Sequence, residues 1–328
     1  MNVLVTGASG FIGANVARKL VEKKFPVTLL VREKSNLQAV DDILDKVTLR
    51  YGDVTDRKSI FEAMEGITNV YHCAGKAHIG GGKDRQLYAI NVEGTRNVLE
   101  AAMHEEVKKV VYTSSVSAIG ITGTKEPADE NQDWNLDELN VTYFKTKHLA
   151  ENEVKVAVDQ GLDCVIVNPS YVFGEWDVNF NAGRLIKDLY FHKIPVYPTG
   201  GINVADVQNV VNGHLVAMEG GLKGERYILG GENLTYKEVF DTICRIVKAP
   251  RVWLPLYKSL VRLFVNLTAD MRIHRKISAL ANREILESSS KYFYYSSKKA
   301  YSTLAYQRTP FDESIFRTFN WYKEKGLL

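Results

Sequence analysis

TGASGFIG, residues 6–13, decides the fold of this chain. It follows the β-branched run Val3–Thr6 and opens an amphipathic segment. Its glycines have the spacing of a dinucleotide-binding turn. Gly7 permits a tight turn, Gly10 lets backbone approach a pyrophosphate, and Gly13 lets helix and strand pack closely. The free N–H groups of the helix N-terminus would then bind the phosphates. The alternative is a tight βα turn without a ligand, because a glycine triplet alone is weak evidence.

The first half of the chain alternates strand-like runs with helix-like segments. This rhythm predicts right-handed βαβ units in a parallel sheet covered on both faces, and apolar runs such as VVYT and CVIV fit strands buried on both sides. We therefore expect an α/β fold: a Rossmann-type doubly wound parallel sheet with a smaller, mixed C-terminal lobe. The expected strands are Val3–Thr6, Val27–Val31, Val47–Tyr51, Asn69–Cys73, Lys109–Thr113 and Cys164–Asn168, and the expected helices are Ile12–Lys23, Ser59–Glu65, Gln86–His104 and Asn140–Gln160.

The rhythm changes after Pro169, and the segments become irregular up to Gly201. Thr235 followed by Glu238 fits a capping box at a helix start. The expected later elements are helices at Asp206–Glu219, Thr235–Val247 and Glu313–Lys325 and a strand at Arg226–Leu229. The predicted division is a dinucleotide-binding domain over residues 1–168, to which 202–230 returns, and a substrate-binding lobe formed by 169–201 and 231–328.

Composition excludes several function classes. The net charge of +3, without a dense Lys/Arg run, argues against a nucleic-acid partner. The cysteines Cys73, Cys164 and Cys244 show neither metal-ligand spacing nor a disulfide framework, so we expect no metal and a reducing, cytoplasmic location. The chain opens on a strand-like run and has no apolar run of membrane-spanning length, so we expect neither a signal peptide nor a spanning helix. The mixed apolar and basic stretch Trp253–Lys276 predicts a surface helix, which either packs its apolar face on the lobe or leans on a membrane.

The end of the second strand bears on the choice between NAD and NADP. The acidic residue that binds the ribose 2′-hydroxyl of NAD is missing at Leu30 and Val31, and Arg32 follows. A guanidinium suits a 2′-phosphate through paired hydrogen bonds, so the sequence favours NADP(H) over NAD(H). Two alternatives stay open: Glu33 takes the hydroxyl, or Arg32 is only a solvated loop charge.

Asp53 follows the third strand in the run YGDVTD. Its carboxylate would cap the turn or the next helix. It would also reach the adenine amino group, with Val54 against the ring, and the two roles are compatible.

The pentapeptide YFKTK, residues 143–147, supplies the catalytic candidates. Tyr143 and Lys147 would share one helix face, and they follow a strand end rich in hydroxyls, Thr113–Ser115. The same spacing recurs at Tyr294/Lys298 and Tyr295/Lys299. There Ser296 or Ser297 would cap a helix that holds Lys298, so we interpret those two tyrosines as structural.

The proposed chemistry rests on the charge near the phenol. A free phenol has a pKa near 10, which is too high for ready proton exchange at neutral pH. We expect the Lys147 ammonium and the positive nicotinamide to lower the pKa of Tyr143. In the reducing direction Tyr143 would then protonate a carbonyl oxygen that Ser115 holds.

Together these motifs resemble the extended short-chain dehydrogenase/reductase superfamily, of the NAD-dependent epimerase/dehydratase type. The match runs through TGASGFIG, GDVTD, HCAG, NVEGT, VYTSSVSAIG, YFKTK and NPSYVFG. The resemblance implies a Ser–Tyr–Lys triad at Ser115, Tyr143 and Lys147. The resemblance favours Ser115 over Ser114, because the family's hydroxyl lies five residues before the glycine of its V-Y-G motif, which reads AIG here and ends at Gly120. The cofactor-binding residues expected from the motifs and this resemblance are Gly7, Gly10, Phe11, Ile12, Gly13, Arg32, Asp53, Val54, Ala74, Gly75, Asn91, Thr113, Asn168 and Pro169.

Two branches of the superfamily compete. The segment GGINVADVQNV lacks the Arg that nucleotide-sugar epimerases and dehydratases usually carry there. Residues 200–235 instead look like dihydroflavonol 4-reductases and hopanoid-associated reductase-like proteins. We therefore expect an NADP(H)-dependent reductase of a ketone or aldehyde on a small hydrophobic molecule. A nucleotide-sugar epimerase/dehydratase is the alternative, and a non-catalytic dinucleotide sensor is a third. The resemblance also makes a homodimer possible.

Overall fold

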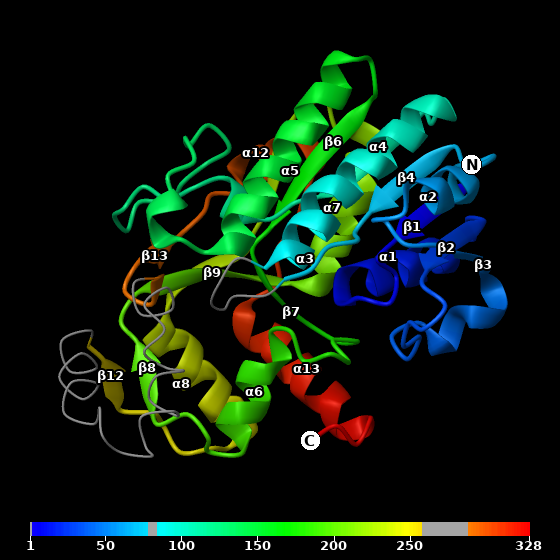
Figure 1. Ribbon diagram of the computed structural model, residues 1–328. Coiled ribbons are helices and arrows are strands. Elements are labelled where there is room, and N and C mark those ends of the chain that lie inside the picture. Colours follow the sequence, from blue (N-terminus) through cyan, green and yellow to red (C-terminus); the bar gives the residue numbers. More distant parts are fainter. Residues whose placement is uncertain (1, 78–83, 258–287) are drawn as a thin grey trace, which may run out of the picture.

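A computed structural model describes residues 2–77, 84–257 and 288–328. Its centre is a seven-stranded sheet in the order β10-β6-β5-β4-β1-β2-β3, in which every neighbouring pair is parallel (Figure 1). The order turns back on itself beside β1, which opens a crevice for ligands at the carboxyl ends of β1 and β4. The strands are β1 (Val3–Thr6), β2 (Val27–Val31), β3 (Thr48–Tyr51), β4 (Asn69–His72), β5 (Lys109–Thr113), β6 (Cys164–Pro169) and β10 (Arg226–Leu229).

Helices cover both faces of the sheet. Each of β1, β5 and β6 is almost entirely buried, as the continuous apolar runs predict. One face carries α1 (Phe11–Glu22), α7 (Val207–Gly220) and the short α12 (Lys298–Leu304), and the other carries α2 (Arg57–Met64), α4 (Gly94–His104) and α5 (Thr142–Asp159). The fold class predicted from the sequence is confirmed.

A smaller lobe lies beside the carboxyl edge of the sheet, at the bottom of the view in Figure 1. It contains a small sheet in which β9 is paired with β11, β13 and β7, and a two-stranded pair of β8 and β12. Its helices pack around an aromatic core that includes Phe173, Phe311 and Tyr322. The lobe elements are β7 (Tyr171–Phe173), α6 (Gly183–Tyr190), β8 (Val196–Pro198), β9 (Gly201–Asp206), β11 (Glu232–Thr235), α8 (Tyr236–Val247), β12 (Leu254–Leu256), β13 (Tyr292–Phe293) and α13 (Phe311–Glu324).

Most expected elements lie within two residues of their predicted bounds. Thr235 and Glu238 form the predicted capping box at the start of α8. The helix expected at Gln86–His104 is divided: α3 (Arg85–Tyr88) passes into the π-helical turn Ala89–Glu93 and then into α4. Single π turns are frequent at functional sites, and this one contains Asn91.

The prediction of a helix at Trp253–Lys276 is wrong for its first residues, because Leu254–Leu256 forms strand β12, which pairs with β8. Residues 258–276 of that prediction lie outside the described residues. Segment 202–230 contributes to both parts of the molecule: β9 belongs to the sheet of the smaller lobe, and β10 belongs to the seven-stranded sheet. The predicted domain boundaries stay predictions.

Candidate active site

The glycine turn is built as tightly as the sequence predicts. Gly7 has a φ of +71°, and a Cβ atom there would lie 2.5 Å from the backbone nitrogen of Ala74. A Cβ on Gly13 would lie 2.4 Å from the Gly7 carbonyl oxygen, so the helix packs directly against the turn. Gly10 is the N-cap of α1, and no side chain caps that helix end. The first N–H groups of α1 therefore face outward at a point that suits a pyrophosphate.

The predicted adenosine-side residues lie at the ends of β2 and β3. Arg32 is exposed in a tight turn, in which its N–H group donates to the Ser35 hydroxyl at 3.1 Å. Asp53 accepts from the N–H group of Thr55 at 2.9 Å, so its carboxylate caps the turn as expected. Val54 is buried against Gly94 at the start of α4. None of these contacts decides between NAD and NADP.

Hydroxyl groups end strand β5, as the sequence indicates, but they point in different directions. The Thr113 hydroxyl lies 2.9 Å from His214 Nε2 on α7 and 3.2 Å from Cys73 Sγ. Ser114 is buried, and its hydroxyl lowers the pKa of Glu151 on α5. Ser115 begins a 3-10 turn, and its hydroxyl accepts from the Ser117 N–H group at 3.2 Å. Only Ser115 of these three interacts with the Tyr143 phenol.

Tyr143 lies in the first turn of α5 and is partly buried. Burial raises the pKa of its phenol, and the side chains of Ser115 and Ser117 lower it by a smaller amount. The Ser117 hydroxyl is buried without a partner of hydrogen-bond geometry, so it lies near the phenol but is not bound to it. The phenol therefore stays protonated at neutral pH.

Lys147 bears on the predicted pKa of Tyr143. Its ammonium is buried and donates to the Thr113 carbonyl oxygen at 2.8 Å and to the Tyr112 hydroxyl at 3.2 Å. In the chain without nucleotide, burial dominates the pKa of Tyr143 and Lys147 is not among the groups that lower it. The lysine turns toward the free carbonyl at the end of β5. The expectation that Lys147 and a bound nicotinamide together lower this pKa stays a prediction. Burial lowers the pKa of Lys147 to about 8.

The segment after β4 closes over this lysine. A Cβ on Gly75 would lie 3.9 Å from Lys147 Nζ and 3.4 Å from Asn91 Oδ1. The Asn91 amide accepts from the Lys76 N–H group at 2.8 Å and donates to the Thr146 hydroxyl at 3.0 Å. Asn91 thus ties the segment that contains Gly75 to helix α5, which is a structural role.

Asn168 and Pro169 end strand β6 beside Ser115. Asn168 is fully buried and donates to the Ser115 carbonyl oxygen at 3.0 Å, while its own Oδ1 atom has no partner. The Ser170 hydroxyl is also buried without a partner. Unpaired buried polar atoms are costly, and a ligand in the crevice is one way to satisfy them. With the uncapped helix end at Gly10, they fit a bound dinucleotide.

Two buried groups at this site, His214 and Glu151, were not predicted from the sequence. His214 on α7 donates from Nδ1 to the Val210 carbonyl oxygen, which leaves Nε2 to accept from Thr113. Glu151 lies one helical turn after Lys147, and its carboxylate accepts from the Asn168 amide at 2.6 Å. The repeat Tyr143, Lys147, Glu151 along one helix face was a readable signal for the carboxylate.

The interpretation of the other two Tyr-x-x-x-Lys copies as structural stays a prediction, and the burial of their tyrosines agrees with it. Tyr294 and Tyr295 are buried and precede α12, whose N-cap is Ser297. The Ser296 hydroxyl accepts from the Lys298 N–H group at 3.4 Å, so it is the serine that contacts the first turn.

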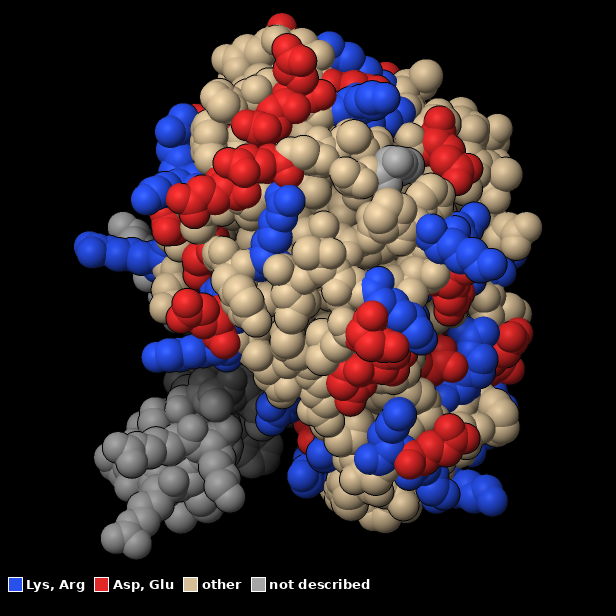
Figure 2. Space-filling view, turned by 90° about the vertical axis from the view of Figure 1, so that its right-hand side faces the viewer, with Lys and Arg blue, Asp and Glu red and all other residues tan. Residues whose placement is uncertain are grey.

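Charge on the molecular surface is mixed on the face drawn in Figure 2, where Lys and Arg alternate with Asp and Glu around uncharged patches. In the described part of the chain, we find no helix with an apolar run of membrane-spanning length.

Comparisons with known proteins agree with this geometry. The profile of the 3-beta hydroxysteroid dehydrogenase/isomerase family matches residues 4–232. A "Putative dihydroflavonol 4-reductase" of Synechocystis sp. is 33% identical, over 99% of this chain and 95% of the relative. "Sterol demethylase protein B" of Methylococcus capsulatus is 34% identical, over 76% of each chain. The crystal structure of a protein named gox2253 has a TM-score of 0.86 and 31% identity, over 99% of this chain and 98% of the other.

Proposed function

The chain belongs to the 3-beta hydroxysteroid dehydrogenase/isomerase family of NAD(P)-dependent oxidoreductases, and within it we propose an NADP(H)-dependent reductase of a ketone or aldehyde on a small hydrophobic molecule. The observation that carries the proposal is the meeting of Tyr143 and Ser115 at the carboxyl edge of the sheet, above the buried ammonium of Lys147. Ligands of open α/β sheets bind at this edge.

The dinucleotide would lie across the turn Gly7–Gly13, with its pyrophosphate at the N-terminus of α1 and its nicotinamide toward Asn168 and Pro169. Phe11 and Ile12 would present their N–H groups to the phosphates. When bound, the nicotinamide supplies the hydride that reduces the carbonyl, or accepts it in the reverse direction. Ala74, Gly75 and Asn91 would border the same groove, and Lys147 would donate to the nicotinamide ribose.

Tyr143 would act as the general acid. Because burial raises the pKa of its phenol, the phenol holds its proton at neutral pH and can donate it to a carbonyl oxygen. Ser115 would donate a hydrogen bond to the same oxygen and hold it as negative charge develops. A protonated phenol is the form that reduction requires.

Arg32 supports the choice of NADP(H). It is exposed at the end of β2, where a 2′-phosphate would lie, and Leu30 and Val31 offer no carboxylate. Asp53 and Val54 would contact the adenine.

A hydrophobic substrate is supported by the names of the relatives, which include a "Putative dihydroflavonol 4-reductase" and a "Sterol demethylase protein B". Most aromatic residues of the lobe pack on other side chains. Phe173 packs edge-on against Phe311, Phe180 stacks on Tyr322, and Trp176 lies under the Arg18 guanidinium. Tyr171, on β7, is 36% exposed. A cytoplasmic location and a homodimer stay predictions.

The test is a spectrophotometric assay of purified protein with NADPH or NADH and a panel of hydrophobic ketones and aldehydes, steroid and flavonoid ketones included. We expect oxidation of NADPH with at least one panel member and its loss in Tyr143→Phe, while that variant still binds nucleotide. Turnover of nucleotide sugars alone, with tightly held NAD, would instead establish the epimerase/dehydratase alternative.

A further inference from the structure

Glu151 is a buried carboxylate that the proposed chemistry does not use. Its side chain is 1% exposed on α5, one turn after Lys147. An ionised carboxylate is costly to bury unless it is paired and hydrogen-bonded. Its partners therefore indicate what it does.

One carboxylate oxygen of Glu151 reaches the site through Asn168. Its Oε1 atom accepts from Asn168 Nδ2 at 2.6 Å, and the same nitrogen donates to the Ser115 carbonyl oxygen at 3.0 Å. Glu151 thus fixes the amide that holds the backbone at Ser115. Without it, Asn168 could rotate and release the start of the 3-10 turn.

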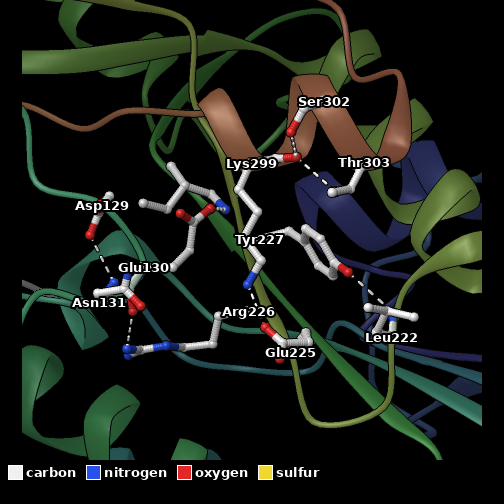
Figure 3. A network of polar contacts seen from close by, with 11 residues as sticks. Asp129, Glu130, Asn131, Leu222, Glu225, Arg226, Tyr227, Lys299, Ser302 and Thr303 are labelled. Atoms are coloured by element: carbon white, nitrogen blue, oxygen red, sulfur yellow. Dashed lines mark hydrogen bonds and ion pairs between the residues drawn. The ribbon is translucent and has the colours of Figure 1, made fainter.

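The other oxygen is paired with Arg226 at the edge of the sheet. Glu151 Oε2 lies 3.4 Å from Arg226 Nη1, and Arg226 Nη2 donates to the backbone carbonyl of Glu130 (Figure 3). The Glu130 carboxylate in turn accepts from the Ile228 N–H group on β10 at 2.8 Å. Arg226 is therefore held in place by the edge strand. It opposes the effect of burial, which raises the pKa of Glu151.

Lys147 faces groups from three elements. Tyr112 approaches from β5, His72 and Cys73 from β4 and its end, and Glu151 from its own helix. Burial raises the pKa of the Cys73 thiol to about 11 and that of Tyr112 well above its usual value, and it lowers the pKa of His72 to about 3. These three groups are uncharged near neutral pH. Glu151, which is paired with Arg226, is then the neighbour whose negative charge acts on Lys147 and raises the pKa of Lys147.

We propose that Glu151 is a positioning residue of the active site, which holds Ser115 through Asn168 and keeps the buried Lys147 ammonium charged, with Arg226 as its counter-ion. The proposal rests on the proposed function, because it concerns the site that contains Ser115 and Lys147. A charge at Glu151 raises the pKa of Lys147 against the effect of burial. The nucleotide would then meet a protonated lysine at neutral pH.

The test measures NADPH affinity by fluorescence titration between about pH 6.5 and about pH 9.5, the range in which a lysine with a pKa of about 8 titrates. In the wild type, affinity falls as Lys147 loses its proton near pH 8. In Glu151→Gln we expect this fall about one pH unit lower, because the opposite charge is gone. Glutamine still accepts from Asn168, so Glu151→Gln removes the charge and keeps this hydrogen bond. Glu151→Ala removes the acceptor as well, and we expect it to lower kcat more than Glu151→Gln does.

Glu130→Gln is the matched control, because it alters a second buried carboxylate in the same network that contacts neither Asn168 nor Lys147. Its titration should match that of the wild type. Should Glu151→Gln not fold, Arg226→Gln removes the counter-ion of Glu151 and should move the titration of Lys147 away from that of the wild type, and a titration equal to that of the wild type would count against the pair. Superimposable profiles of Glu151→Gln, Glu130→Gln and wild type would overturn the role of Glu151. A wild type that binds neither NADPH nor NADH would refute the proposed function itself.

Discussion

Gly13→Ala is the sharpest perturbation of the nucleotide turn. The added Cβ would lie 2.4 Å from the Gly7 carbonyl oxygen and 2.8 Å from its carbonyl carbon. Both atoms are backbone, and the oxygen already accepts from the Gly10 N–H group at 2.9 Å. Relief therefore requires the turn Gly7–Gly10 to move away from α1. Overpacking of this kind costs about 1–3 kcal/mol, and the gain in helix propensity from Gly to Ala returns about 1 kcal/mol.

The larger effect falls on the nucleotide, because the turn presents the N–H groups that would hold the phosphates. Loss of one hydrogen bond to a charged group costs about 1.5–3 kcal/mol, which corresponds to a drop in affinity of roughly 10- to 150-fold. Fluorescence titration with NADPH measures the affinity, and urea unfolding measures the stability. Gly220→Ala, in α7, is the control, because no heavy atom lies within 4 Å of its Cβ and it gains the same propensity. Equal NADPH affinity of Gly13→Ala and Gly220→Ala would refute the reasoning.

Three further predictions concern single side chains. Ser115→Ala should lower kcat by about 10²-fold, the effect of losing one preorganised donor, whereas Ser114→Ala should spare kcat; equal losses would reject Ser115 as the donor. Arg32→Ala should weaken NADPH binding by about tenfold, or about 1.4 kcal/mol, and leave NADH binding unchanged, and a parallel loss for both nucleotides would contradict a 2′-phosphate contact. Burial lowers the pKa of His214 to about 4. Below about pH 6.5 this histidine is therefore protonated in the unfolded chain and stays neutral in the folded chain until the pH approaches 4. Between about pH 7 and pH 5, the free energy of unfolding measured in urea should therefore fall by about 2 kcal/mol less in His214→Gln than in the wild type. An equal pH dependence of the two unfolding free energies would exclude a buried neutral histidine.

The large sheet was predictable because its strands carry their own signal. Strands such as Val3–Thr6 and Lys109–Thr113 are buried on both faces, so apart from the half-buried Lys109 at the start their residues are apolar or neutral, and each run is short and continuous. The lobe offers no such signal. The helix Gly183–Tyr190 and the strands Tyr171–Phe173 and Val196–Pro198 were missed, because each is short and depends on contacts with distant segments.

The sequence predicted which residues meet at the site, but it did not predict how the Lys147 ammonium is held there. Ser115, Tyr143 and Lys147 meet at one sheet edge because the carboxyl ends of parallel strands and the following helix starts share that edge. The direction of the Lys147 side chain was not predictable, because it depends on the free carbonyl of Thr113, which has no further strand partner. Glu151 was missed because its importance comes from Asn168, which lies on another element.

The three copies of Tyr-x-x-x-Lys show why spacing alone cannot identify a catalytic pair. Residues four apart face each other only when both belong to one helix. Tyr143 and Lys147 both lie in α5, whereas Tyr294 and Tyr295 precede the N-cap Ser297 and point into the core before α12 begins. Even in α5, shared helical phase brings the lysine to the same face without bringing its charge to the phenol, because Thr113 and Tyr112 hold the ammonium. The motif therefore fixes which residues meet, and the strand end beneath them decides what each side chain does.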